Sequence, residues 1–198
     1  MIHIIGIGGV GFWLTVGLTR SVPSNTIQCW DDDTLEGGTG ATRLPWAPAN
    51  TKKTALLKGY LTMVLADIVL PTFQDRKFSG LLGLTEGDTV VDCTDMALVP
   101  RKRMWSVVKN KGCKILRVSY DGRGSTLVVS TGLPFMAPAE GGYAAIPSLA
   151  LSFGAGGMGA EAVKRYLDTP VDSFTLSLSV QEAMTPSIER RVVIERTV

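Results

Sequence analysis

The sequence predicts an α/β fold in which a doubly wound, mostly parallel sheet is continued by a late antiparallel extension. A glycine-rich turn separates an apolar stretch at residues 2–5 from an apolar helical pattern, which is the strand–turn–helix order of a Rossmann-like domain. Strand and helix patterns alternate through the first half of the chain, as they do in parallel sheets. Because 198 residues can bury a substantial core, we expect residues 1–198 to form a single domain.

The elements of the first half follow from the spacing of apolar residues. Short continuous apolar runs predict buried strands, and apolar residues three or four positions apart predict helices. Thr51 is the expected N-cap of the second helix, and Pro71 is its expected stop. The predicted elements are a strand at 2–5, a helix at 10–20, a strand at 26–30, a helix at 51–70 and a strand at 89–93.

The second half is predicted to finish the parallel sheet and then to add antiparallel strands. Residues 121–124, Asp-Gly-Arg-Gly, predict a hairpin turn, and residues 133–146 are rich in Pro, Gly and Ala and predict a loop. The small residues of the last helix are more typical of core packing than of an interface. The predicted elements are a helix at 101–111, strands at 113–119 and 126–130, a helix at 148–167, and strands at 174–180 and 191–196.

The composition argues against several classes of function. The net charge of +2 requires no nucleic-acid partner, and no stretch is apolar and long enough to span a bilayer, so we expect a cytoplasmic protein without a membrane partner. The three cysteines form no Cys-x-x-Cys pair, so we expect reduced, buried thiols and no structural zinc. His3, the single histidine, lies in the first strand, which leaves no imidazole for a serine or cysteine nucleophile. The basic run at 101–103 is expected to be a solvated helix start.

The glycines that follow the first strand predict a phosphate-binding turn. Gly6 permits a tight turn, and Gly8 and Gly9 let the backbone approach a phosphate without a Cβ in the way. Gly11 lets the helix pack close to the strand, and the helix N-terminus offers free N–H groups and the positive end of a dipole. Asp31 lies about 20 positions further on, where an acid holds a nucleotide ribose. On these residues alone, an NAD-dependent oxidoreductase is the favoured interpretation.

Further landmarks change that interpretation. The glycine motif has the form Gly-x-Gly-Gly-x-Gly, and several charged positions follow it in a fixed order. These landmarks are Asp31-x-Asp33, Arg43, the helix-opening Lys53, the stretch Val91-Asp92-Cys93-Thr94-Asp95, and the helix segment 159–164. In this order and at near this spacing they resemble the ThiF/MoeB family, the adenylyltransferases related to ubiquitin-activating enzymes. The resemblance covers about residues 1–167.

The resemblance implies an activity and a set of site residues. Members of this family bind ATP and Mg²⁺ and let a substrate carboxylate attack the α-phosphate, which gives an acyl-adenylate and pyrophosphate. The implied partner is the C-terminal glycine of a small ubiquitin-like or sulfur-carrier protein. Asp31 would hold the ribose hydroxyls, with Asp33 beside it in the cofactor site. Arg43 and Lys53 would neutralise the phosphates, and Asp95 would hold Mg²⁺ at the end of its strand.

Each of these residues also has a simpler interpretation. The acids after the second strand could be turn residues, and Arg43 could be a loop arginine paired with an acid. Lys53 could be solvated at the start of a helix, where Lys52 would serve equally well. Asp95 could be the N-cap of the helix that follows it.

The sequence departs from the family pattern in several places. Met96 replaces the asparagine of an Asp-Asn pair, and a second family asparagine is missing before Arg43. The first strand starts at residue 2, so the N-terminal helix whose arginine reaches a partner subunit's ATP is not expected. No cysteine lies between Gly132 and Ser148, so transthiolation is not expected. A catalytically degenerate nucleotide-binding scaffold or partner subunit and an NAD-dependent oxidoreductase therefore stay open. Family members pair, so we expect a homodimer or a heterodimer with a related subunit.

Overall fold

The strands in the described part of the chain form one sheet. A computed structural model describes residues 1–35, 47–65, 69–79, 83–120, 126–131, 149–169, 175–180 and 190–195. The strands among them are β1 (Ile2–Ile5), β2 (Ile27–Trp30), β3 (Thr72–Gln74), β4 (Thr89–Asp92), β5 (Lys114–Tyr120), β6 (Thr126–Ser130), β7 (Thr175–Val180) and β8 (Arg190–Glu195). Their order in this 8-stranded sheet is β3-β2-β1-β4-β5-β6-β7-β8.

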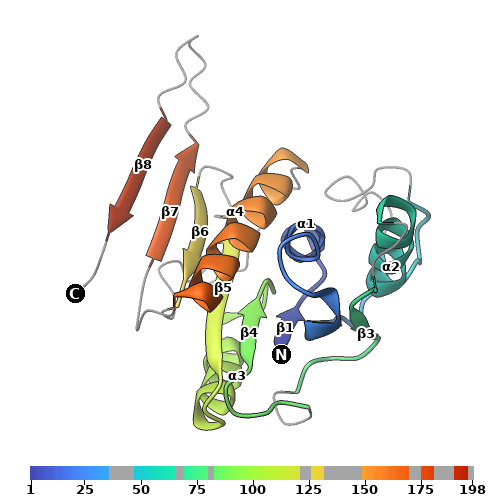
Figure 1. Ribbon diagram of the computed structural model, residues 1–198, viewed down its shortest axis with the longest axis horizontal. Helices are drawn as coiled ribbons and strands as arrows, with labels where there is room; N and C mark the ends of the chain where they lie inside the picture. The colour runs from blue at the N-terminus through green and yellow to red at the C-terminus, as the bar shows by residue number, and fades with distance from the viewer. Residues whose placement is uncertain are drawn as a thin grey trace.

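The sheet has a parallel part and an antiparallel part. From β3 to β5 every neighbouring pair is parallel, in the strand order of a Rossmann-like domain. From β5 to β8 every neighbouring pair is antiparallel. Figure 1 shows β6, β7 and β8 continuing the sheet beyond β5, on the side away from helix α2. The predicted fold class, including the late antiparallel extension, is confirmed.

Helices cover both faces of the parallel part. They are α1 (Gly9–Leu18), α2 (Lys53–Val64), α3 (Leu98–Asn110) and α4 (Leu149–Asp168), with a short 3-10 turn at Ser24–Thr26. Successive strand residues point to opposite faces, so Val91 and Leu116 pack with α1, α2 and α4, whereas Val90 and Ile115 pack with α3. None of the helices in the described part of the chain combines the length and the apolar character that crossing a membrane requires.

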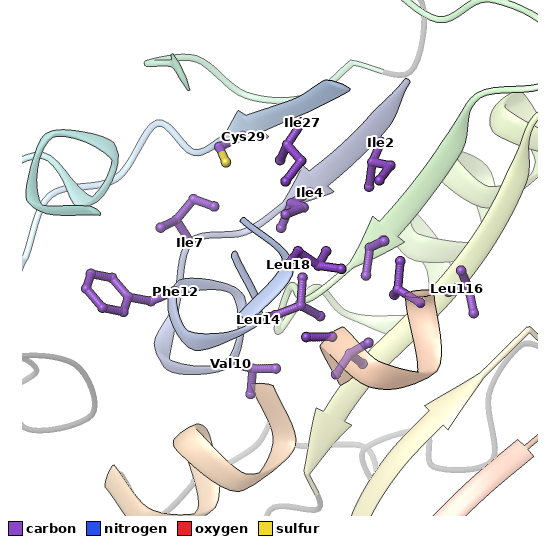
Figure 2. Close-up of a cluster of buried hydrophobic side chains, with 14 of the residues drawn as sticks. Ile2, Ile4, Ile7, Val10, Phe12, Leu14, Leu18, Ile27, Cys29 and Leu116 are labelled. Atoms are coloured by element: carbon purple, nitrogen blue, oxygen red, sulfur yellow. The ribbon is translucent and has the colours of Figure 1, made fainter. Parts of the chain in front are cut away.

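The main core lies between the central strands and α1. Every residue of β1 and β4 is buried, which is why these strands do not alternate between apolar and exposed polar residues. Figure 2 shows Leu14 and Leu18 on the side of α1 that faces Ile4 of β1. The helix is apolar on most of its surface because α4 covers it as well, and Figure 1 shows the two helices side by side.

The small residues of α4 serve this contact with α1. A Cβ added at Gly156 would lie 2.7 Å from the backbone nitrogen of Leu14, and one added at Gly159 would lie 2.5 Å from Val118 Cγ1. Larger side chains at these positions would therefore push α4 away from α1 and the sheet. The composition of this helix is explained by packing within the chain, as the sequence predicts.

Several predicted helix boundaries are wrong. The helix expected at 51–70 ends at Val64, and its N-cap is Lys52, without a side-chain cap from Thr51. The sequence also did not predict β3, because three residues carry too little pattern to distinguish a strand from a loop. The helix expected at 101–111 begins three residues earlier, at Leu98. The predicted hairpin turn at 121–124 and the loop at 133–146 lie outside the described residues.

The earlier start of α3 corrects the interpretation of the basic run at 101–103. Pro100 lies in the first turn of α3, where its missing N–H breaks no helical hydrogen bond. Arg101 is therefore inside the helix, and its side chain is fully buried rather than solvated. Lys102 and Arg103 are exposed, as expected.

His3 is buried and contacts the Trp30 indole and the Asp88 carboxylate. The Trp30 indole Nε1 donates to His3 Nδ1 at 3.2 Å, and the Asp88 Oδ2 atom lies 3.1 Å from Nε2. Both contacts are satisfied when the ring carries its proton on Nε2, and a second proton on Nδ1 would displace Trp30. Burial lowers the pKa of His3 from 6.5, although the hydrogen bond to Asp88 opposes this.

Acidification below pH 6.5 is accordingly expected to destabilise the protein through His3. In that range the unfolded chain takes up a proton that the folded chain does not, so the contribution present above pH 6.5 is lost as the pH falls towards the folded pKa. Because His3 is the only histidine, a His3→Gln variant should show a flatter stability profile between pH 7.5 and 5. Thermal unfolding followed by circular dichroism at several pH values measures this. Equal pH slopes for both proteins would contradict it.

Candidate functional site

A pocket of about 410 Å³ opens where the parallel strands end. It lies at the switch point of the sheet, because the chain winds from β1 to β2 and β3 in one direction and from β4 to β5 in the other. Its volume falls within the range of small-molecule sites. The predicted site residues that line it are Gly6, Gly8, Gly9, Asp31, Asp33, Lys53 and Asp95. Arg43 lies outside the described residues.

The glycine turn forms one wall of this pocket. Gly6 has a φ of 83°, which favours glycine, and a Cβ there would lie 3.0 Å from Thr94 Cγ2. Gly8 is the N-cap of α1, with extended backbone and no side-chain cap, and the first turn of the helix contains no acid. The N-terminus of α1 therefore faces the pocket with the N–H groups and the dipole end that suit an anion.

Gly11 has a different role from the other glycines of the motif. It does not line the pocket but lies behind the turn, where a Cβ would be 1.9 Å from the carbonyl oxygen of Gly6. Its missing side chain lets the first turn of α1 touch the glycine turn. Gly11 thus shapes the pocket without contributing a wall.

Asp31 connects the glycine turn to the end of β2. Its Oδ2 atom accepts a hydrogen bond from the Ile7 backbone N–H at 2.6 Å, and its Oδ1 atom accepts one from the Asp33 N–H at 2.8 Å. Burial raises the pKa of Asp31, while these two hydrogen bonds and the Lys53 charge lower it. The carboxylate can accept further hydrogen bonds on its pocket side, because each oxygen has two lone pairs.

Lys53 places a positive charge beside the acids that follow β2. Its Nζ atom lies 2.6 Å from Asp33 Oδ2 and 4.0 Å from Asp31 Oδ1, and it lines the pocket. The neighbouring Lys52 instead donates to the backbone oxygen of Asp32 at 2.6 Å. Of the two lysines that the sequence left equivalent, the structure therefore places Lys53 in the pocket wall.

Asp95 is an exposed acid on the opposite wall. It follows β4, and the helix after it begins with Ala97 as N-cap and without a side-chain cap. The interpretation of Asp95 as a helix cap is therefore wrong. Its carboxylate lines the pocket, where it is available to a bound cation.

Sequence reasoning missed a buried charge cluster beneath this wall, formed by Asp92, Arg101 and Arg117. Asp92 Oδ2 lies 3.2 Å from Arg101 Nε and 3.8 Å from Arg117 Nη1, and it accepts a hydrogen bond from Trp105 Nε1 at 2.9 Å. Asp92 Oδ1 accepts hydrogen bonds from the backbone N–H and the hydroxyl of Thr94. A charged residue within each of two adjacent apolar strands, Asp92 in β4 and Arg117 in β5, is the signal that could have found this cluster.

Cys93 also lines the pocket, but its thiol is not an activated nucleophile. Burial and the neighbouring Asp92 charge raise the pKa of Cys93. Burial likewise raises the pKa of Cys29 to about 12. A thiol attacks as its thiolate, so these cysteines are chemically inert near neutral pH. The three cysteines are free, and Cys29 and Cys113 are buried, as predicted.

Comparison with known proteins identifies relatives by fold alone. Neither the protein-family models nor the curated protein sequences match this chain. MccB from E. coli matches in structure with a TM-score of 0.69 at 13% sequence identity, over 98% of this chain and 62% of MccB. The complex of MccB with ATP gives a TM-score of 0.69 at 16% identity over 100% of this chain and 64% of MccB. PaaA matches with a TM-score of 0.63 at 14% identity, over 98% of this chain and 64% of PaaA. The chain thus has the fold of MccB, which supports the predicted ThiF-like fold, and it spans less than two thirds of that protein's length.

Proposed function

We propose that this protein binds ATP with Mg²⁺ and activates a carboxylate as an acyl-adenylate. The observation that carries the proposal is the convergence of the glycine turn, Asp31, Lys53 and Asp95 on one pocket at the switch point of the sheet. Structures of MccB with ATP and with AMPCPP share this fold, and they support a nucleotide as the ligand.

The pocket fits a nucleotide triphosphate in its chemistry. The ribose hydroxyls would meet Asp31, whose carboxylate is already oriented by two backbone N–H groups. The phosphates would meet the N-terminus of α1 and the Lys53 ammonium. Asp95 offers the carboxylate oxygen that Mg²⁺ prefers, and a bound Mg²⁺ would neutralise part of the charge of the phosphates.

The proposed reaction needs positioning and charge neutralisation rather than a general base. A carboxylate oxygen attacks the α-phosphorus, the bond between this phosphorus and the bridging oxygen breaks, and pyrophosphate leaves with that electron pair. The attacking group is already ionised, so no proton has to be removed. The described pocket wall contains no histidine and no activated thiol, in accord with this chemistry. Lys53 and the α1 N-terminus would stabilise the negative charge on the phosphates.

We propose the C-terminal glycine of a ubiquitin-like or sulfur-carrier protein as the carboxylate. Complexes of MccB with MccA, and the description of MccB as a microcin C7 biosynthetic enzyme, support a second substrate beside the nucleotide. The family resemblance supports the protein C-terminus, and it also supports a cytoplasmic homodimer or a heterodimer with a related subunit. Size-exclusion chromatography with light scattering tests the oligomeric state.

Exchange of labelled pyrophosphate into ATP tests the adenylation. We expect exchange that depends on the added carboxylate partner. It should fall about 10²- to 10³-fold in an Asp95→Ala variant, because Mg²⁺ would then no longer neutralise the negative charge of the leaving pyrophosphate. The matched control is Asp168→Ala, which removes an exposed acid that pairs with Lys164 at the end of α4. Exchange that survives Asp95→Ala would contradict the assigned site.

Ligand binding separates the adenylyltransferase from its alternatives. Tight ATP binding without exchange, under any partner tried, would identify a degenerate nucleotide-binding scaffold or partner subunit. A thermal shift with NADH and none with ATP would identify an NAD-dependent oxidoreductase. Both measurements use the same purified protein, so a single preparation decides among the three.

A further inference from the structure

Arg117 is a buried cation in the pocket wall that the proposed nucleotide site has not yet used. It lies on β5, in register with Asp92 of the neighbouring strand β4. Its side chain is 8% exposed, and it lines the pocket on the same side as Asp95. The Nη1 atom is buried and has no hydrogen-bond partner among the described residues.

Arg117 shares its carboxylate partner with a second arginine. One carboxylate, Asp92, faces two guanidinium groups, and it lies closer to Arg101 at 3.2 Å than to Arg117 at 3.8 Å. Arg101 also donates from Nη2 to the Thr94 backbone oxygen at 3.0 Å. Asp92 is thus engaged by Arg101, Trp105 and Thr94, and Arg117 shares this carboxylate at the longer distance.

A buried guanidinium whose counter-ion is distant and shared is unfavourable unless a further anion meets it. The adjacent Cys93 thiol cannot supply a negative charge, because burial raises its pKa. Among the described residues, Asp92 is the one carboxylate within ion-pair distance of Arg117. Arg117 lines the pocket, so a bound ligand can supply that anion.

We propose that Arg117 binds the terminal phosphates of the nucleotide and supplies, from within this chain, the cation that opposes their charge. This inference rests on the proposed function. A nucleotide with its ribose beside Asp31 at β2 and its phosphates at the turn after β1 extends along the strand order towards β4 and β5. Arg117 lies at the β5 end of that path. Its planar fork of N–H donors suits phosphate oxygens, and the exposed part of the side chain lies in the pocket wall.

Arg117→Met tests this role, because it removes the charge and retains much of the side-chain volume. We expect the affinity for ATP·Mg²⁺ and for inorganic tripolyphosphate to fall about 10- to 100-fold, while the affinity for AMP, which lacks the terminal phosphates, stays within about twofold. Isothermal titration calorimetry on the whole protein measures all three ligands. Arg103→Met is the matched control, since Arg103 is exposed on α3.

The stability of the ligand-free variant is a second readout. Arg117→Met leaves Asp92 paired with Arg101 at 3.2 Å and removes the second cation that shares this carboxylate, so the melting temperature should stay equal or rise. If Arg117 only stabilised the fold, its substitution would lower the melting temperature. Arg117→Lys keeps the positive charge but lacks the planar set of guanidinium donors, so its tripolyphosphate affinity should lie between those of Arg117→Met and the wild type.

The outcomes separate this inference from the proposed function. Unchanged ATP and tripolyphosphate affinities in Arg117→Met would overturn the inference while leaving ATP binding in place. An Arg117→Met variant in which only the KM for the carboxylate rises would overturn it in the same way. A lowered melting temperature, or an equal loss of AMP affinity, would also overturn it. Wild-type protein that binds tripolyphosphate through Arg117 but not ATP would refute the proposed nucleotide and retain the anion-binding role. Wild-type protein that binds neither would refute both.

Discussion

Gly11→Ala is expected to destabilise the fold by about 3 kcal/mol or more and to abolish nucleotide binding. The new Cβ would lie 1.9 Å from the Gly6 carbonyl oxygen and 3.0 Å from the Gly6 carbonyl carbon, and both are backbone atoms. The turn cannot retreat easily, because the Gly6 N–H donates to the Trp30 oxygen at 2.9 Å. A Cβ at Gly6 would itself already touch Thr94, so the space on that side is filled.

Gly59→Ala is the matched control for this substitution. Gly59 lies in α2, and a Cβ there meets nothing within 4 Å. Alanine has a higher helix propensity than glycine, so this variant should be more stable than wild type, by up to about 1 kcal/mol. Chemical denaturation of the three proteins, followed by tryptophan fluorescence, gives the free energies of unfolding. Similar values for Gly11→Ala and wild type would show that the contact between helix and turn is not required.

The glycine turn and the parallel sheet were predictable because their signals are local. Gly6, Gly8 and Gly9 follow an apolar strand directly, and the backbone conformation and close approach that they permit are properties of a few consecutive residues. Strands that are buried on both faces are short apolar runs, and the helices between them have their own spacing. The order of these elements and the positions of Asp31 and Lys53 therefore predict a pocket at the ends of the parallel strands.

The burial of charged residues was not predictable in the same way. Asp92 and Asp95 lie three positions apart in one short stretch, yet Asp92 is fully buried and Asp95 is exposed. Arg101 belongs to a basic run that looks like a solvated surface, but it faces the sheet because α3 begins at Leu98. Which acid pairs with which arginine depends on strand register and helix rotation, and both are set by contacts between distant parts of the chain.

Asp92→Asn is expected to destabilise the protein by roughly 3–5 kcal/mol, although it changes a single atom type. The amide could still accept a hydrogen bond from Trp105 or from Thr94, but it would carry no charge. The buried guanidinium groups of Arg101 and Arg117 would then lose the negative charge with which both of them pair. Urea unfolding at pH 7, with circular dichroism as the signal, measures this loss.

Asp95→Asn is the control that distinguishes charge burial from charge alone. It removes the same charge three residues away, on an exposed side chain, and should change the free energy of unfolding by less than about 0.5 kcal/mol. Adding Arg117→Met to Asp92→Asn should restore part of the lost stability, because one of the two buried cations is then absent. If Asp92→Asn and Asp95→Asn unfolded at the same urea concentration, the buried cluster would not contribute to the fold. If the double variant were less stable than Asp92→Asn, the unfavourable burial of the Arg117 charge beside Arg101 would be contradicted.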